Sequence, residues 1–532
     1  MLKKFLNPLP VFNVVFLALF GILTLFVGLS PTINKFGLFQ PVIILFSLAT
    51  VVAAACMAFM SYRPGKRTVR LYPWFMVAAF VAALAIELLI AHALTSYGYS
   101  WDSEFVYNQA VQFGQHGSLD PGFLVYLRDN PNNIGLLTIL GLFFKVLHHF
   151  GVTNYLFAAV LLNVGVLFLT HIVTTVVAYM MYGRRIAVIA FGFGFVFITL
   201  SMYVQTPYTD TLTVLFPITI FFLALLFVKY SALYARILIA ALIAILGVIG
   251  YLIKPTAIIA VVALMIISFI WLVATKNGPP FSKRLGLYAV YAATGLMFAG
   301  VTYLGFTKVV DATHMLPYAY ADAGDLSKPI THYMAMGMRS KVVGNSVNYG
   351  GFDSELTNTI VKLQTEQAKK NFAKDAISRQ LSDYGPVGYA AFLGHKIKWI
   401  TSDATFYAYG EGTNKNVKFM YQDKGSTTIR KFMYVDGKYY QLFGNTLQVF
   451  WIAILLLISM QLFFVIMNRH SRSNVYTSTL RLMITGVLLF LLMFEGRSRY
   501  IFLYVPIFII LALYTLQLFK ENEDFSEHID GK

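Results

Sequence analysis

Long apolar stretches separated by short polar segments dominate this chain. Each apolar stretch is about 20 residues long, which is enough for a helix to cross the hydrocarbon core of a membrane. Twelve transmembrane helices are predicted, near residues 8–29, 38–62, 73–96, 155–182, 186–204, 208–228, 236–252, 256–275, 285–308, 447–467, 481–495 and 500–519. A polar stretch from about 309 to 446 precedes the last three. The pattern therefore predicts an α-helical polytopic membrane protein with one large polar insert.

Residues 134–150 decide how these helices are threaded through the membrane. The segment is apolar, but it is shorter than the predicted spans and contains Lys145, His148 and His149. If it does not cross, four basic loops lie on the cytoplasmic side, as the positive-inside rule requires. These loops contain Arg184/Arg185, Lys229/Arg236, Lys276/Lys283/Arg284 and Arg469/Arg472/Arg481. We therefore expect 134–150 to be a helix lying along the membrane surface, with both termini cytoplasmic.

This threading places several polar segments together on the outer face. They are residues 98–133, 205–210 and 495–500, together with the insert. The convergence of polar segments on one face is the first indication of a functional site.

The N-terminus resembles a signal peptide but has no small-residue cleavage site, so a retained first helix is predicted.

Composition supports a membrane protein and excludes an assembly of soluble domains. Of the 532 residues, 58% are apolar and only 12% are charged, about half the charged fraction of a soluble protein. The formal net charge of +17 comes from basic residues that cluster in short loops between apolar runs, which argues against nucleic-acid binding. The single cysteine, Cys56, excludes an intramolecular disulfide.

Two acids follow the third predicted span, in the sequence Tyr99-Ser100-Trp101-Asp102-Ser103-Glu104. Asp102 or Ser103 could cap a helix, with Glu104 near its positive end. Alternatively, Asp102 is a general base at the membrane surface that polarises an acceptor hydroxyl. The sequence leaves both interpretations open.

Three further outer segments contain charged residues next to hydrocarbon. Asp210 could cap a helix, although an acid so close to an apolar run is also a functional candidate. Lys254 either extends to the interface or meets a lipid phosphate. In the segment 495–500, Glu495 could pair with one arginine, Arg497 or Arg499, and leave the other as a bidentate phosphate ligand.

In their order along the chain, these motifs resemble the GT-C class of membrane glycosyltransferases. This class includes protein O-mannosyltransferases and the lipid A aminoarabinose transferase. The sequence looks most similar to members from Gram-positive bacteria that modify the cell surface, which have stretches similar to 329–337 and 348–352. The resemblance extends from about residue 73 to the end of the chain, and the two spans before it depart from the simplest family layout.

The resemblance implies a sugar donor linked to polyprenyl phosphate, an extracellular active site in a bacterial plasma membrane, and inversion at the anomeric carbon. By motif position, Asp102 is the base, Glu104 the neighbouring acid and Asp210 the second external acid of the site. The acceptor would be a teichoic acid, a polysaccharide or a protein. Candidates for binding the donor or its phosphate are Arg499, Arg497, Lys254, His332, Arg339 and Lys341.

No phosphate-binding glycine loop, Asp-x-Asp motif or ligand-spaced histidine cluster occurs in the sequence, so neither a metal nor another cofactor is expected. A polyprenyl-linked sugar flippase or other transporter is the main alternative, and it predicts polar residues in mid-helix and an internal repeat. A polymerase of surface polysaccharide is a further alternative, distinguished by a diphosphate-linked oligosaccharide donor.

The chain divides into four predicted parts. Residues 1–72 form two N-terminal helices, and 73–308 form the transmembrane core with a first external loop at 98–154. Residues 309–446 form an external domain of mixed α/β structure, and 447–532 the last helices and a cytoplasmic tail. Within the insert, 353–383 is expected to be helical.

Overall fold

The computed structural model describes residues 8–29, 40–59, 66–97, 101–275, 279–313, 327–343, 346–409, 417–467 and 474–530. Several residues of the predicted motifs and basic loops lie outside this part of the chain: Tyr99, Ser100, Lys276, Arg469 and Arg472.

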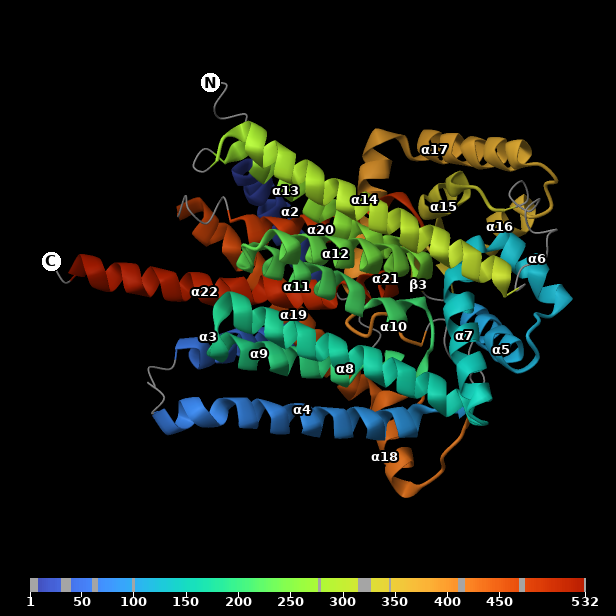
Figure 1. Cartoon of the computed structure of the whole chain (residues 1–532), viewed down its shortest axis with the longest axis horizontal. Helices are drawn as coiled ribbons and strands as arrows, with labels where there is room; N and C mark the ends of the chain where they lie inside the picture. Colours follow the sequence, from blue (N-terminus) through green and yellow to red (C-terminus); the bar gives the residue numbers. More distant parts are fainter. Residues whose placement is uncertain are drawn as a thin grey trace.

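Ten helical segments of the described chain are long and apolar enough to cross a membrane. Eight are single helices: α2 (Leu9–Leu29), α3 (Gln40–Phe59), α4 (Lys66–Leu94), α8 (Tyr155–Tyr182), α12 (Leu233–Ile253), α14 (Phe281–Ala312), α19 (Tyr440–Met467) and α20 (Val475–Met493). Two join a short helix to a longer one: α10 (Thr209–Thr213) with α11 (Leu215–Lys229), and η5 (Pro255–Ile258) with α13 (Ile259–Ala274). Figure 1 shows the long helices running in roughly one direction.

The other two predicted spans, 186–204 and 500–519, do not form one continuous apolar helix of that length, and the apolar helix of the second is Val505–Phe519. Helix α9 (Arg184–Gly194) continues into a π-helical turn, η3 (Phe195–Thr199). The ring of His171 bridges this turn, since its two nitrogens lie 3.0 Å from the Thr199 hydroxyl and 3.0 Å from the Phe191 carbonyl. An inserted side chain of this kind is a common cause of an irregular turn within a helix.

The last helix, α22 (Val505–Asp530), follows the short helix α21 (Arg499–Phe502), and its first part lies within the bundle (Figure 1). Every residue of 501–516 is buried, as expected for a helix that is apolar on all sides and surrounded by others. The ring of Trp451 on α19 packs 5.2 Å from that of Phe508. At the edge of the bundle, α14 packs on α12 and has Val310 as its one buried residue.

The segment 134–150 forms α7 (Ile134–His149), which is shorter than the spanning helices. In Figure 1 it runs across the direction of α4 and α8, as a helix along the membrane surface would. It packs against α5 (Trp101–His116) through buried residues such as Phe113, Leu140 and Phe144. A Cβ atom at Gly135 would lie 1.8 Å from the carbonyl oxygen of Leu252, so glycine allows α7 to approach the end of α12.

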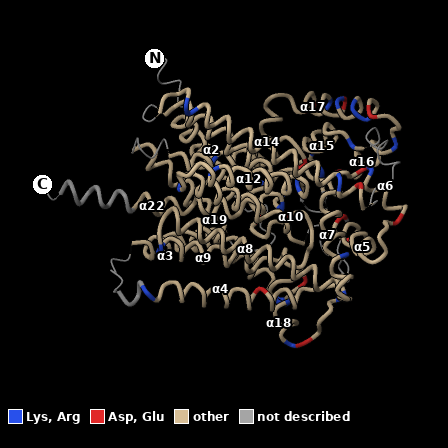
Figure 2. The backbone as a smooth tube through the Cα atoms, viewed as in Figure 1, with Lys and Arg blue, Asp and Glu red and all other residues tan. Residues whose placement is uncertain are grey.

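The insert is mainly helical. It contains α15 (Ile330–Gly337), a hairpin of β2 (Ser340–Val343) and β3 (Ser346–Tyr349), then α16 (Ser354–Ile360), α17 (Glu366–Thr401), β4 (Lys418–Phe419) and α18 (Lys424–Met433). The expected helix at 353–383 is therefore split into α16 and α17, and α17 has a second break at Gly385. Helices α15 and α16 lie at the same end of the bundle as α5, α6 (Pro121–Asp129) and α7 (Figure 1). Charged residues also gather at this end, whereas the long helices have few (Figure 2).

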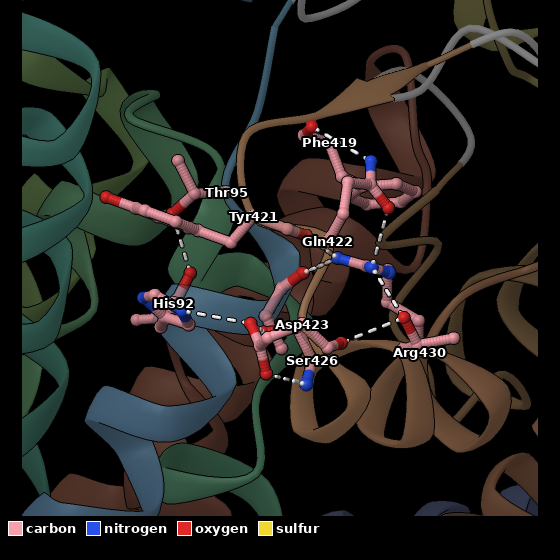
Figure 3. A network of polar contacts seen from close by, with 11 residues as sticks. His92, Thr95, Phe419, Tyr421, Gln422, Asp423, Ser426 and Arg430 are labelled. Atoms are coloured by element: carbon pink, nitrogen blue, oxygen red, sulfur yellow. Dashed lines mark hydrogen bonds and ion pairs between the residues drawn. The ribbon is translucent and has the colours of Figure 1, made fainter.

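The C-terminal part of the insert is attached to the C-terminal end of α4 (Figure 3). Strand β4 pairs with β1 (Ser96–Tyr97), which directly follows α4. The His92 ring stacks on Tyr421 at 3.7 Å, and its Nε2 lies 3.3 Å from Asp423 Oδ2. Arg430 donates hydrogen bonds of 2.8 Å to the carbonyls of Ala93 and Tyr421. These contacts fix α18 beside the C-terminal end of α4.

Candidate functional site

Asp102 lies within the first turn of α5, because the helix begins at Trp101. It therefore does not precede the helix as an N-cap would. Its Oδ1 accepts a hydrogen bond of 2.8 Å from the hydroxyl of Tyr126 on α6. The carboxylate is thus oriented by a side chain of the neighbouring helix. Glu104, partly buried, belongs to the same first turn.

The Tyr126 hydroxyl continues into a chain of polar contacts. Asn133, at the end of the short helix η2 (Pro131–Asn133), donates to it at 2.6 Å, and the hydroxyl of Tyr208 donates to the Asn133 side-chain oxygen at 3.4 Å. Burial and the charge of Asp102 raise the pKa of both Tyr126 and Tyr208. Both phenols are therefore protonated at neutral pH, and Tyr126 donates to Asp102 while Tyr208 donates to Asn133.

Asp210 and Lys254 form a buried ion pair. Asp210 is the second residue of α10, and Lys254 is the residue at which α12 ends. Their side chains are 2% and 8% exposed, so Lys254 does not extend to the interface. The ammonium also lies 4.3 Å from the centre of the Tyr500 ring, a distance at which a cation is attracted to the ring face.

The two arginines of the segment 495–500 have different surroundings. Arg497 Nε lies 3.7 Å from Glu495 Oε1, and its guanidinium lies 5.2 Å from the Tyr407 ring. Arg499 Nη2 donates to the Tyr500 hydroxyl at 3.0 Å. The glutamate therefore pairs with Arg497.

Tyr208 lies among the predicted groups. Asp102 is linked to Tyr208 through the Tyr126 hydroxyl and the Asn133 side chain, and Asp210 follows Tyr208 by two residues. Lys254 contacts both Asp210 and the Tyr500 ring, and Arg499 donates to the Tyr500 hydroxyl. The structure thus brings together residues from α5 and α6, from the start of α10 and from α21. The site therefore contains two carboxylates, Asp102 and Asp210, and two cations, Lys254 and Arg499.

His332, Arg339 and Lys341 lie in the insert and have partners there. Arg339 Nη1 is 3.1 Å and Lys341 Nζ is 3.9 Å from the carboxylate of Asp353. His332 is 1% exposed, with Nε2 3.5 Å from the Thr357 hydroxyl. Burial, and secondarily the charge of Lys328, lower the pKa of His332 to about 4. The histidine is therefore neutral at physiological pH.

Sequence reasoning missed the polar residues that surround Asp102. Besides Tyr126, Asn133 and Tyr208, they include Lys328, whose Nζ donates to the Asn130 side-chain oxygen at 2.7 Å. Burial lowers the pKa of Lys328, while nearby carboxylates, first among them Asp102, oppose this shift. The one sequence feature that could have indicated them is the polar run Asn130-Pro131-Asn132-Asn133, which lies in the same predicted loop as the acidic motif.

Comparison with known proteins places the chain in a family. A family model described as "conserved hypothetical integral membrane protein" matches residues 8–519, almost the whole sequence. The chain belongs to this family. A search of curated proteins finds no relative that matches it. Among solved structures, the chain is similar to ArnT from Cupriavidus metallidurans, crystallised bound to undecaprenyl phosphate, with 12% sequence identity and a TM-score of 0.30. The match covers 83% of this chain and 77% of ArnT.

Proposed function

We propose that this protein is a GT-C type glycosyltransferase that moves a sugar from a polyprenyl-phosphate donor to a cell-surface acceptor on the outer face of a bacterial plasma membrane. The observation that carries the proposal is a set of contacts that joins Asp102 to Tyr208, through Tyr126 and Asn133, and joins Asp210 to Arg499, through Lys254 and Tyr500. Such a group supplies a base for an incoming hydroxyl and cations for a departing phosphate.

Asp102 acts as the general base. The acceptor hydroxyl oxygen bonds to the anomeric carbon of the sugar while its proton passes to the carboxylate. The bond from that carbon to the phosphate oxygen breaks, the electron pair leaves with polyprenyl phosphate, and the anomeric configuration inverts. Because Tyr126 occupies Oδ1 of Asp102, we assign the incoming proton to Oδ2.

Arg499 binds the donor phosphate, because a guanidinium can hold a phosphate through two parallel hydrogen bonds. Lys254 adds a second cation, which Asp210 keeps in place. Fixed cations at the position where negative charge develops stabilise the transition state. Arg497 supports the segment that presents Arg499, and Glu104, His332, Arg339 and Lys341 border the site.

A transporter of polyprenyl-linked sugar is the second candidate. The observation in its favour is Glu87, which is fully buried inside the span of α4 with neither carboxylate oxygen hydrogen-bonded. Ionisable groups at such depth often mark a transport pathway. The enzyme is the stronger proposal because the acids and cations of the candidate site lie at helix ends.

Transfer can be tested with the purified protein in lipid vesicles, a radiolabelled sugar on undecaprenyl phosphate and an acceptor fraction from cell walls. We expect Asp102→Asn to lower the rate at least about 100-fold, the usual contribution of a positioned base. Asp120→Asn is the matched control, since Asp120 is an exposed acid that caps α6 and asparagine caps equally well.

Two outcomes separate the possibilities, and a further experiment identifies the substrates. Transfer by Asp102→Asn at the rate of the unaltered protein would overturn the base assignment. If the unaltered protein transfers no sugar but moves the labelled lipid between leaflets, the transporter replaces the enzyme. Comparing the surface glycans of a deletion strain with those of its parent identifies the sugar and the acceptor.

A further inference from the structure

Lys396 is a fully buried lysine within the second half of α17, after the break at Gly385, and burial lowers its pKa to about 7. Its ammonium donates three hydrogen bonds, each to a backbone carbonyl. The acceptors are Gly337 at 2.6 Å, Phe494 at 2.6 Å and Leu492 at 3.1 Å. A lysine ammonium has three N–H donors, so this residue uses all of them on the main chain.

The three carbonyls belong to the ends of two helices. Gly337 is the last residue of α15, and Leu492 and Phe494 lie at the end of α20. The last carbonyls of a helix have no partner within it and carry partial negative charge, so a cation there is stabilising. Lys396 therefore joins the insert to the end of α20, immediately before the segment that contains Arg497 and Arg499.

The backbone around Lys396 makes the same connection. The amide of Glu495 donates to the Tyr333 carbonyl at 3.1 Å, and that of Gly496 donates to the Gly350 carbonyl at 2.8 Å. Gly350 has a φ of +72°, and a Cβ atom there would lie 2.5 Å from Lys396 Cε. Only glycine fits this position, so the contact between insert and segment is closely packed around the lysine.

We propose that Lys396 is a positioning residue, which fixes the segment Glu495–Arg499 and thereby holds Arg499 toward the donor phosphate. This inference rests on the proposed function of Arg499. Arg499 follows Phe494 by five residues, and the chain between them is bonded to the insert at Glu495 and Gly496. Loss of the lysine frees the end of α20 at one side of this short segment. In the unaltered protein, the insert therefore contributes to donor binding through Lys396.

The test is a double-mutant cycle with Lys396→Met, Arg499→Ala and both changes together. The measurement is the Kd for fluorescent undecaprenyl phosphate on the purified full-length protein in nanodiscs. Arg499→Ala is expected to weaken binding about 10- to 100-fold, the usual effect of losing a hydrogen bond to a charged group. Lys396→Met is expected to weaken it about 10-fold. The double variant is expected to bind as Arg499→Ala does, because Lys396 acts through Arg499.

A matched control is Lys370→Met, which removes a half-exposed lysine from the first half of the same helix, where it pairs with Glu366. It is expected to leave the Kd unchanged. Should Lys396→Met yield no folded protein, the cycle is run with Lys396→Gln, which retains two N–H donors for the carbonyls. In the transfer assay, the change is expected to raise KM for the donor and leave KM for the acceptor as it was.

The outcomes distinguish this inference from the proposal on which it rests. Unaltered protein that does not bind undecaprenyl phosphate overturns the proposed function. Unaltered protein that binds it, together with a Lys396 variant of equal affinity, overturns only the positioning role. A double variant whose fold-loss in affinity equals the product of the two single fold-losses would also overturn that role. Such a result would show that the two residues act independently.

Discussion

The ammonium of Lys254 is paired with the carboxylate of Asp210, which lies 44 positions earlier in the chain, and both side chains are buried. The pair joins the end of α12 to the start of α10, directly beneath the Tyr500 ring. The sequence did not explain why Asp210 and Lys254 each lie next to an apolar run. The ion pair explains both, because each charge compensates the other when the side chains are buried.

Removing one member of this pair is expected to destabilise the protein strongly. Asp210→Asn or Lys254→Met leaves an uncompensated buried charge, which costs about 3–5 kcal/mol. The double variant lacks both charges, so it is expected to lose less than the sum of the single changes. Thermal unfolding in detergent measures the effect. Additive losses would show that the two groups do not depend on each other.

Tyr126→Phe is expected to lower the transfer rate about 10-fold or more, because Asp102 loses the hydrogen bond that orients it. The loss should fall on kcat, since the tyrosine acts on the base. Tyr97→Phe, at an exposed tyrosine of the same external region, serves as the control. Unchanged kcat in Tyr126→Phe would mean that the acid is positioned by other groups.

His332 is expected to make the folded state sensitive to acid. Its pKa in the folded protein is about 4, against 6.5 for an unperturbed histidine, so the unfolded chain takes up a proton first as the pH falls. Stability is therefore retained above about pH 6.5 and lost progressively toward pH 4. His332→Gln should flatten this part of the profile of unfolding temperature against pH. His149→Gln, at an exposed histidine on α7, should leave it unaltered.

The threading of the helices predicts which surfaces an impermeant thiol reagent can reach in intact cells. In a Cys56→Ser background, a cysteine replacing Arg185 should be shielded, whereas one replacing Asp120 should be labelled. Arg185 is preferred over its neighbour Gly183, whose φ of +84° would strain a cysteine. Labelling at 185 with protection at 120 would reverse the assigned sidedness.

Much of the bundle was predictable because its cause is local. A helix in lipid satisfies its own backbone hydrogen bonds, so a run of about 20 apolar residues is sufficient to predict a span. Ten predicted spans are long helices, and the separate, shorter helix at 134–150 was indicated by its length and by its basic and histidine residues. The π-turn after α9 was not predictable, since it depends on His171 from another helix.

The candidate site was predictable only as a set of residue types. The sequence identified Asp102, Asp210, Lys254 and the arginines as charges that need partners at the outer face. It could not supply those partners, because they lie far away along the chain. Asp102 meets Tyr126 after 24 positions, and Lys396 meets Phe494 after 98.

The sequence by itself thus determined a membrane bundle with a polar insert and a set of charged residues at helix ends. Only the tertiary structure decided which charges neutralise one another, which acid is held by a tyrosine and which lysine caps the helix before Arg499. The physical reason is that apolar burial depends on the composition of each segment. Pairing of charges depends instead on distances of a few ångströms, which arise only when the helices pack together.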